Sequence, residues 1–389
     1  MSDVDVAVAL VGGGPAGSTT ALSLVREHGV RPEDVAIVEK AVHPREKPCA
    51  GAISAWGLRA LEELGEPLSV PSAPMLGVRV LRAGEVGATE ARMGAVVRRS
   101  AFDASLFASA RRAGVRAFEG EALVGIAREG GGFALRTSKR TVRAKLLAAC
   151  DGAGSTTRKL LGVREAARKG HLYVTETPEA EGDEGTARGL CDFDLSPVLD
   201  GLEGYYWDFP TVIDGARWVS RGIYHANLTP RSNVKASLLA HLARRGVAHE
   251  RARLKPFSTR PFVRGAPLWG DGWVLVGEAA GIDRTTGEGI AQAILFGRMA
   301  AEHLARAART GERTFERYER DVLGSTMGRH LLQSAVLARF VFARAGRPFQ
   351  DFLLRSPYAR AQAARWYEGD PLEPSTIARL GAGLVRHLL

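Results

Sequence analysis

The sequence lacks several features that would assign it to other protein classes. It contains only three cysteines, Cys49, Cys150 and Cys191, which are widely spaced and odd in number. This pattern indicates neither a disulfide framework nor a zinc site, and we expect no metal ion. No apolar run reaches the roughly 18 residues that a membrane-spanning helix requires. No basic segment and apolar leader precede Asp3 and Asp5, so we expect a cytoplasmic protein.

Long blocks of one charge are also missing, although the net charge is +10. Most of the positive charge is arginine, and the arginines are spread along the chain among acidic residues. A solvated, arginine-rich surface explains this distribution better than a nucleic-acid footprint, so we expect no nucleic acid partner. The 389 residues, 45% hydrophobic and 25% charged, are typical of a globular protein with two or three packed regions.

The stretch from residue 4 to residue 39 organises the rest of the chain. A valine-rich run, 4–11, predicts a buried strand that leads directly into a glycine turn, 12–17. A helical pattern and a second apolar strand, 35–38, follow, and Glu39 ends the unit. This order is typical of a dinucleotide-binding unit, in which an acid about 20 residues after the glycines accepts hydrogen bonds from an adenosine ribose.

Each residue type of the turn has a role in such a unit. Gly12 allows the tight turn, Gly14 lets a pyrophosphate approach the backbone, and Gly17 lets the helix pack closely on the sheet. Pro15 and Ala16 open the helix, whose N-terminal amides and partial positive charge attract phosphates. The turn therefore predicts a nucleotide site.

Two later strands end on glycine turns of the same kind. The apolar run 146–150 leads into a turn at 151–155, and the run 273–276 leads into a turn at 277–289. Helical patterns follow both turns, so their free N-terminal amides favour an anionic group. We expect the three turns to converge on a single nucleotide ligand.

Two further segments are candidates for the reactive end of this site. The loop after Glu39 carries Cys49, which is either a buried small hydrophobic residue or a residue facing a cofactor ring or substrate. The aromatic segment 204–210 predicts an antiparallel strand in which Trp207 either fills the core or lines an apolar pocket. Tyr206 and Trp207 point to opposite faces of a strand, so both cannot line one cavity.

These patterns predict an α/β protein with a discontinuous nucleotide-binding domain and an inserted substrate domain. The basic helical C-terminal region either packs on the domain interface or makes peripheral contact with a membrane surface. The predicted nucleotide domain comprises 1–75, 98–165 and 263–310, the substrate domain comprises 76–97 and 166–262, and the helical region comprises 311–389.

Over about residues 4–310 the chain resembles the flavoprotein oxidoreductases of the geranylgeranyl reductase and p-hydroxybenzoate hydroxylase superfamily. The turn 12–17 looks like its FAD fingerprint, and the helix start at Arg99 looks like its flavin-contacting helix. Asp151-Gly152 is similar to its DG motif, and Gly277-Glu278 is similar to its GD motif. The resemblance implies FAD and a Rossmann-like fold of the glutathione reductase type, with an inserted antiparallel-sheet substrate domain and C-terminal helices.

Three segments resemble the geranylgeranyl reductase branch of the superfamily. Residues 47–54 are similar to its K-x-C-G-G-G-x-S loop, residues 205–210 to its Y-x-W-x-F-P strand, and Gly287-Glu288-Gly289 to its G-E-G turn beside the flavin ring. Some residues depart from these patterns. Glu278 stands where the superfamily has Asp, alanines replace two glycines of the cysteine loop, and Arg284 lies near the place of a proline.

The pattern and the resemblance together give a set of candidate site residues. The catalytic candidates are Cys49 and Trp207. The residues expected to bind the cofactor are Gly12, Gly14, Pro15, Ala16, Gly17, Glu39, Lys40, Lys47, Cys49, Ala50, Arg99, Asp151, Gly277, Glu278, Gly287, Gly289 and Ile290. Because the sequence shows no second dinucleotide unit, we expect NAD(P)H to bind transiently or a partner reductase to supply electrons.

The resemblance implies an FAD-dependent oxidoreductase that reduces a small hydrophobic substrate, either an isoprenoid or another natural product. The first alternative is a monooxygenase that hydroxylates an aromatic or polyketide-like substrate. A flavin-dependent halogenase is less favoured, because residues 44–49 replace the P-R-x-x-I-G-E-S loop of halogenases. A non-catalytic prenyl carrier of the Rab GDP-dissociation inhibitor type is the alternative of another class, and the intact glycine turns argue against it.

Overall fold

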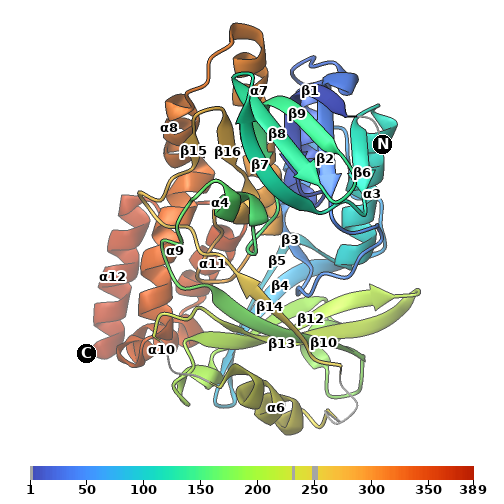
Figure 1. Ribbon diagram of the computed structural model, residues 1–389. Coiled ribbons are helices and arrows are strands. Elements are labelled where there is room, and N and C mark those ends of the chain that lie inside the picture. Colours follow the sequence, from blue (N-terminus) through green and yellow to red (C-terminus); the bar gives the residue numbers. More distant parts are fainter. Residues whose placement is uncertain (1–2, 230–232, 248–252) are drawn as a thin grey trace.

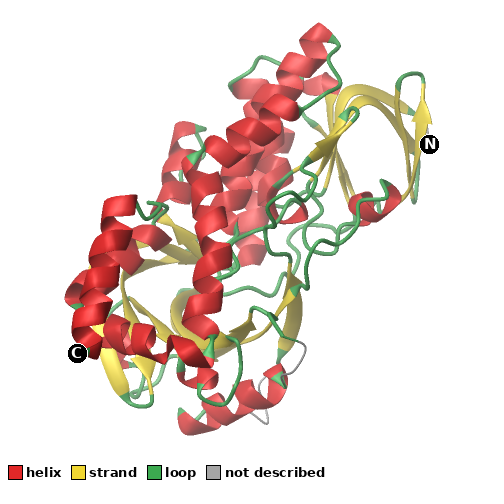
Figure 2. Ribbon diagram, turned by 90° about the vertical axis from the view of Figure 1, so that its left-hand side faces the viewer, coloured by secondary structure: helices red, strands yellow, loops and turns green. Residues whose placement is uncertain are grey.

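The computed structural model describes residues 3–229, 233–247 and 253–389. In these residues two sheets of eight strands each lie one above the other, and the C-terminal helices stand along one side of both (Figure 1). A view turned by a quarter shows the same division, with helices gathered on one side and strands behind them (Figure 2). The predicted fold class, an FAD-binding α/β domain with a second sheet and C-terminal helices, is confirmed.

The first sheet has a parallel centre that determines where the functional site lies. In this centre β1 pairs with β2 and β9, β9 with β16, and β2 with β6, all in parallel. Carboxyl ends of parallel strands meet at one edge, so the turns after β1, β9 and β16 lie together there. The strands of this sheet are β1 (Val4–Val11), β2 (Val35–Glu39), β6 (Arg116–Glu119), β7 (Leu123–Glu129), β8 (Gly132–Thr137), β9 (Thr141–Ala149), β15 (Trp269–Gly270) and β16 (Trp273–Leu275).

Three helices, α1 (Pro15–Arg26), α3 (Arg99–Arg112) and α7 (Ile290–Thr310), pack together over the first sheet. Glycine permits the close approaches that this packing needs. A Cβ on Gly17 would lie 1.9 Å from the carbonyl oxygen of Gly12, and one on Gly297 would lie 2.3 Å from Oγ1 of Thr19. Any other residue at 17 would therefore push α1 away from the strand that it follows.

The second sheet is antiparallel, as expected, except for one parallel pair, β4 with β11. β3 also belongs to this sheet, through its pairing with β5, although the predicted boundaries assign its residues to the nucleotide domain. The strand order is β14-β10-β13-β12-β11-β4-β5-β3. Their bounds are β3 (Ala52–Ser54), β4 (Ser72–Arg82), β5 (Glu85–Val97), β10 (Gly170–Pro178), β11 (Leu190–Asp194), β12 (Gly204–Ile213), β13 (Ala216–His225) and β14 (Lys255–Thr259).

The C-terminal helices cover one face of the second sheet. Tyr205 and Trp207 of β12 pack on this face with Phe342 of α9 and Tyr367 of α11. Tyr206 points to the other face and packs on α6, as the alternation of a strand predicts. The remaining helices are α2 (Ala55–Glu63), α4 (Thr156–Leu160), α5 (Glu184–Ala187), α6 (Val234–Arg244), α8 (Glu316–Gly324), α9 (Thr326–Phe342), α10 (Arg347–Arg355), α11 (Pro357–Tyr367) and α12 (Pro374–Leu388). None of the helices in the described ranges is long and apolar enough to cross a membrane.

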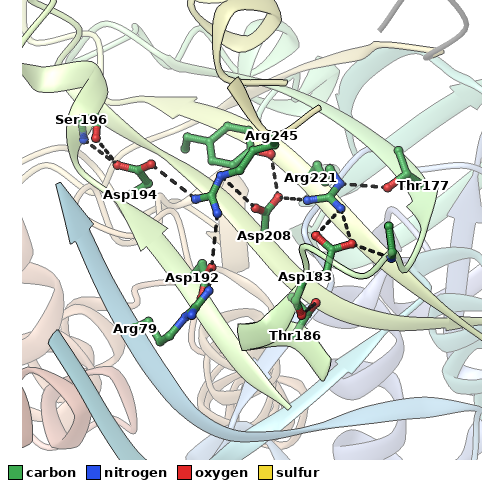
Figure 3. A network of polar contacts seen from close by, with 12 residues as sticks. Arg79, Thr177, Asp183, Thr186, Asp192, Asp194, Ser196, Asp208, Arg221 and Arg245 are labelled. Atoms are coloured by element: carbon green, nitrogen blue, oxygen red, sulfur yellow. Dashed lines mark hydrogen bonds and ion pairs between the residues drawn. The ribbon is translucent and has the colours of Figure 1, made fainter. Parts of the chain in front are cut away.

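The other face of the second sheet carries a buried network of charges (Figure 3). The guanidinium of Arg221 lies 2.6 Å from Asp183 and 2.8 Å from Asp208, and its Nε donates to Oγ1 of Thr177 at 2.8 Å. Arg221, Asp183 and Asp208 are all buried or nearly so. Each charge is thus compensated by direct contact with its opposite, which offsets the cost of removing it from water.

A second arginine pair extends the same network. Arg79 donates two hydrogen bonds to Asp192, at 2.7 and 2.6 Å, and Arg245 lies within 4.0 Å of both Asp192 and Asp208. These contacts join β4, β11 and β12 with the residue that follows α6 (Figure 3). The network therefore holds strands of the second sheet together on the face opposite the C-terminal helices.

We predict that Arg221→Met lowers the free energy of unfolding by about 3–5 kcal/mol, because Asp183 loses its cation and Asp208 keeps only the longer contact with Arg245. Arg188→Met removes an exposed partner of Glu90 and should cost less than about 1 kcal/mol. Urea unfolding of both variants and the parent protein measures these values. Equal losses for the two variants would contradict the assigned role of the network.

Candidate cofactor and substrate site

A cleft of about 440 Å³ lies where the three glycine turns meet. Gly12 and Gly14 come from the first turn, Asp151 from the second, and Gly287 and Gly289 from the third. The parallel strands bring these segments together, although they are far apart in the sequence. The floor of the cleft is bare backbone, which a pyrophosphate requires for close approach.

Most of the residues expected at the cofactor line this cleft. They are Gly12, Gly14, Pro15, Ala16, Glu39, Lys40, Lys47, Cys49, Arg99, Asp151, Glu278, Gly287, Gly289 and Ile290. Gly17 and Gly277 do not line it but allow its shape. A Cβ on Gly277 would lie 2.8 Å from the Cβ of Ala16, so this glycine lets the third turn approach the first. Ala50 lines a separate, polar cavity of about 30 Å³ next to the cleft.

Glu39 is the buried acid at the end of β2. Its Oε2 accepts a hydrogen bond of 2.6 Å from the amide of Gly13, and its Oε1 accepts one of 2.8 Å from the amide of Ala41. The carboxylate is thereby held at the rim of the glycine turn, with further lone pairs available to a ligand. This geometry suits the two hydroxyls of an adenosine ribose.

A buried cluster of Arg45, Arg99 and Asp103 lies beside the first turn. Asp103 accepts two hydrogen bonds from Arg99, both at 2.8 Å, and lies 3.1 Å from Nη2 of Arg45. Burial opposes the ionisation of Asp103, yet the positive charges of Arg99 and Arg45 hold its pKa below the ordinary value. Arg45, which no sequence motif singles out, reaches to within 3.2 Å of the Cβ position of Gly14. The cluster therefore presents positive charge to an anionic ligand.

The second turn is held in shape by Asp151. One of its carboxylate oxygens accepts a hydrogen bond of 2.5 Å from Ser155 Oγ, and the other accepts two of 2.9 Å from Thr157. Its side chain thus caps the start of α4. The second turn therefore offers mainly backbone groups to a ligand in the cleft.

The longer acid at 278 contacts a lysine of the cysteine loop. Oε2 of Glu278 lies 3.2 Å from Nζ of Lys47, and the same ammonium lies 4.7 Å from the ring centre of Phe257. Both Glu278 and Phe257 line the cleft. The pair ties the loop that carries Cys49 to the third turn.

The two catalytic candidates lie in different environments. Cys49 is half-buried and lines the cleft, its Sγ accepts a 3.4 Å hydrogen bond from the amide of Gly51, and Arg99 lies against it. Trp207 is only 2% exposed and lines neither of the two large cavities described in this section. A Cβ on Gly222 would lie 2.2 Å from the Trp207 ring, so the ring packs closely against the backbone of this residue. The packing interpretation of Trp207 fits this placement, and the pocket-lining interpretation does not.

A second cavity, of about 150 Å³, lies between the second sheet and the C-terminal helices. Its lining is almost entirely apolar or aromatic, and Arg360 is the only charged residue among those described. The guanidinium of Arg360 donates to the carbonyls of Ala88, Leu353 and Leu354. Residues on the wall include Val78, Met93, Phe193, Tyr205, Leu337, Phe342, Leu353, Tyr367 and Leu380.

The loop that precedes α7 separates the two cavities. Thr285 and Thr286 line the apolar cavity, whereas Gly287 and Gly289 line the cleft. Tyr205 donates a hydrogen bond to the carbonyl of Thr286, which anchors the loop to the second sheet. A ligand at this end of the cleft would therefore lie within one loop's thickness of a ligand in the apolar cavity.

Glu288, between the two glycines of this loop, is a buried acid that forms no ion pair with the residues that the structure describes. Its Oε1 accepts hydrogen bonds from the amide of Ala291 at 2.9 Å and from Ser54 Oγ at 3.5 Å. Its Oε2 has no hydrogen-bond partner in the described part of the chain. Burial, reinforced by the negative charge of Asp283, raises the pKa of Glu288 to about 8. The carboxyl therefore carries a proton at neutral pH.

Comparison with known proteins bears on the fold and on the cofactor. Residues 5–180 match the family described as FAD binding domain. Digeranylgeranylglycerophospholipid reductase of Methanothrix thermoacetophila is 28% identical over 354 residues, which cover 83% of this chain and 85% of that protein. An uncharacterised protein of Methanosarcina barkeri is 24% identical over 81% of this chain and 80% of its own length.

Solved structures of flavoproteins share the fold. A geranylgeranyl bacteriochlorophyll reductase-like protein from Thermoplasma acidophilum superposes with a TM-score of 0.79 at 21% identity, covering 100% of this chain and 99% of its own. A flavin-dependent brominase gives a TM-score of 0.74 at 18% identity, with 99% of each chain covered. The bare glycine floor, the ribose-type acid Glu39 and the cationic cluster of the cleft fit FAD, which the family match identifies as the cofactor.

We predict that Glu39→Ala weakens FAD binding by roughly 10- to 100-fold, because a charged acceptor of ligand and backbone hydrogen bonds is lost. Glu33→Ala, at an exposed site before β2, should leave the affinity unchanged. Quenching of flavin fluorescence during titration of the apoprotein measures the dissociation constant. An unaltered constant in Glu39→Ala would remove the ribose assignment.

We predict that Glu288→Gln makes the flavin-loaded protein more resistant to unfolding as the pH rises. The pKa of Glu288 is raised from 4.5 to about 8 on folding, so its effect on stability is favourable at low pH and is lost between these values. Glutamine cannot ionise, so the variant should gain a few kcal/mol over the parent by pH 8. Thermal unfolding between pH 5 and pH 8 tests this, with exposed Glu62→Gln as the matched control. Parallel pH profiles for Glu288→Gln and the parent would refute the buried proton.

Proposed function

We propose that this chain, an FAD-dependent oxidoreductase of the geranylgeranyl reductase and p-hydroxybenzoate hydroxylase superfamily, reduces carbon–carbon double bonds in the isoprenoid chain of a hydrophobic substrate. The observation that carries the proposal is the apolar cavity beside the cofactor cleft. A reductase of this kind needs a water-free channel for a hydrocarbon chain that ends next to the flavin.

The composition of the cavity wall supports a hydrocarbon ligand. No carboxylate lines the cavity in the described residues, and Arg360, its one cation, is engaged with backbone carbonyls. An unbranched polar substrate would find few partners there, whereas a prenyl chain would bury apolar surface at about 25 cal/mol per Å². The relatives named digeranylgeranylglycerophospholipid reductase point to the same substrate class.

The residues of the cleft have distinct tasks in this proposal. Bound FAD supplies the redox chemistry, accepting two electrons from a donor and delivering them to the substrate. Glu39 orients the adenosine end, and the amides at the start of α7 place partial positive charge where the pyrimidine end of the ring would lie. Cys49 and Arg99 form the wall at the reactive end, and the aromatic residues of the second sheet exclude water.

The reduction also needs a source of protons. Glu288 holds a proton in the loop between the two cavities, next to Gly287 and Gly289 of the cleft.

We propose NAD(P)H, bound transiently, or a partner reductase as the electron source. We also retain the proposal of a cytoplasmic protein.

The competing function is a monooxygenase that acts on an aromatic substrate. The aromatic rings of Phe193, Tyr205 and Phe342 on the cavity wall favour it, because they could stack on a flat ligand. The two functions differ in their use of oxygen, so one experiment separates them.

The purified, dithionite-reduced protein is incubated without oxygen with a geranylgeranylated glycerophospholipid. We expect reoxidation of the flavin and a product heavier by two hydrogen atoms for each double bond, measured by mass spectrometry. Turnover only in oxygen, with a product heavier by one oxygen atom from an aromatic substrate, would establish the monooxygenase instead. A colourless protein that takes up no FAD would favour a prenyl carrier.

We predict that Ala363→Trp, on the wall of the apolar cavity, reduces turnover by at least about tenfold, because the indole occupies space needed by the chain. Flavin affinity should stay unchanged, since Ala363 does not line the cleft. Ala240→Trp, on the exposed side of α6, is the matched control and should behave like the parent. Full turnover in Ala363→Trp would exclude this cavity as the substrate site.

A further inference from the structure

The C-terminal helix α12 exposes an apolar stripe to solvent. None of its residues is buried, and Ile377 and Leu388 are 51% and 60% exposed. Val385 is exposed as well. The spacings of eight and eleven residues place these three side chains on one side of a helix. Leu380 and Leu384, on the adjoining side of α12, pack on α10, so the stripe lies along the solvent-exposed border of the packed side.

Helix α9 carries a second exposed apolar stripe close by. Phe340 is 60% exposed, and Val336, one helical turn before it, is exposed to a similar extent. Gln333 of the same helix is hydrogen-bonded to Leu372, just before α12, and Arg329 pairs with Glu373. The two helices stand side by side at one edge of the molecule (Figure 1). We call the exposed residues Val336, Phe340, Ile377, Val385 and Leu388 the α9–α12 face.

The α9–α12 face borders the apolar cavity. Leu337 and Val341 of α9 line that cavity, and each follows an exposed residue of the face. Leu380 of α12 lines it from the other side. Apolar residues of α9 and α12 therefore extend from the face to the wall of the cavity.

Positive charge accompanies the face. The last 64 residues, 326–389, contain nine arginines and four acidic residues, so they carry half of the net charge of +10. Arg339 of α9 and Arg379 and Arg386 of α12 are exposed, and none of them forms an ion pair within the described ranges. Apolar residues flanked by unpaired arginines are typical of helices that lie in the interface of an anionic membrane.

We propose that the α9–α12 face docks on the surface of an anionic lipid bilayer and that the apolar cavity takes the chain of its lipid substrate from there. The second half rests on the proposed function, and the first half does not. A second copy of the chain is a poorer occupant, because a two-fold contact would place the arginines of this face against each other. A bilayer with anionic headgroups complements both the charge and the apolar stripe.

The test is co-sedimentation of the FAD-loaded protein with vesicles of phosphatidylcholine, with and without phosphatidylglycerol. We expect binding to the anionic vesicles that weakens in high salt, and little binding to the neutral ones. Arg379→Gln with Arg386→Gln should weaken binding about fivefold for each arginine removed. Phe340→Ser with Ile377→Ser should weaken it on the order of tenfold or more, because both side chains would enter the interface.

Matched controls change the same residue types elsewhere. Val42→Ser with Val124→Ser removes exposed apolar side chains beside the first sheet, and Arg136→Gln with Arg264→Gln removes exposed charges. Both should bind vesicles like the parent. Equal losses in test and control variants, or no binding by the parent, would overturn the proposal. A parent dimer in light scattering that Phe340→Ser dissociates would assign the face to a second copy.

The outcomes for docking and for the proposed function can be told apart. Vesicle binding needs no turnover, so it can hold when no double bond is reduced, and docking then stands alone. If docking is correct, the variants of the face should keep flavin absorbance and act normally on substrate dispersed in detergent, while losing activity on substrate in vesicles. Equal activity on both substrate forms in these variants would count against delivery from the bilayer.

Discussion

The site depends on how closely the carboxyl ends of β1, β9 and β16 approach one another. A Cβ on Gly12 would lie 2.5 Å from the carbonyl oxygen of Cys150, at the end of β9. Just after the end of β16, a Cβ on Gly277 would lie 2.8 Å from the Cβ of Ala16 in the first turn. The cleft exists because these corners are glycine, so its anion-binding floor and its packing have the same physical origin.

The sequence alone predicts the parts of the site that depend on local pattern. The three glycine turns, Glu39 and the strand-to-helix order follow from short segments whose chemistry is specific. Their meeting at one edge follows from parallel pairing, which the alternation of strands and helices indicates. The helices of the C-terminal region also follow from a local pattern, the helical spacing of their apolar residues.

Long-range contacts could not be read in this way. The apolar cavity is built from β4, β5, β11 and β12 on one side and mainly from residues after 330 on the other, and no local pattern records that these meet. The parallel pair of β4 and β11 and the ion pair of Lys47 with Glu278 are non-local too. Trp207 shows that residue type alone does not decide where a side chain lies. Tryptophan is common in binding sites, but this ring packs in the core against Gly222.

The loop that carries Cys49 is fastened on several sides of the cleft. Arg45 pairs with Asp103, Glu46 with Lys255, and Lys47 with Glu278, so consecutive side chains reach α3, the second sheet and the third turn. Residues 45–47 line the cleft, so an FAD bound there would leave past a loop that three ion pairs fasten. Such a loop would slow the release of the cofactor without adding a contact to its adenosine end.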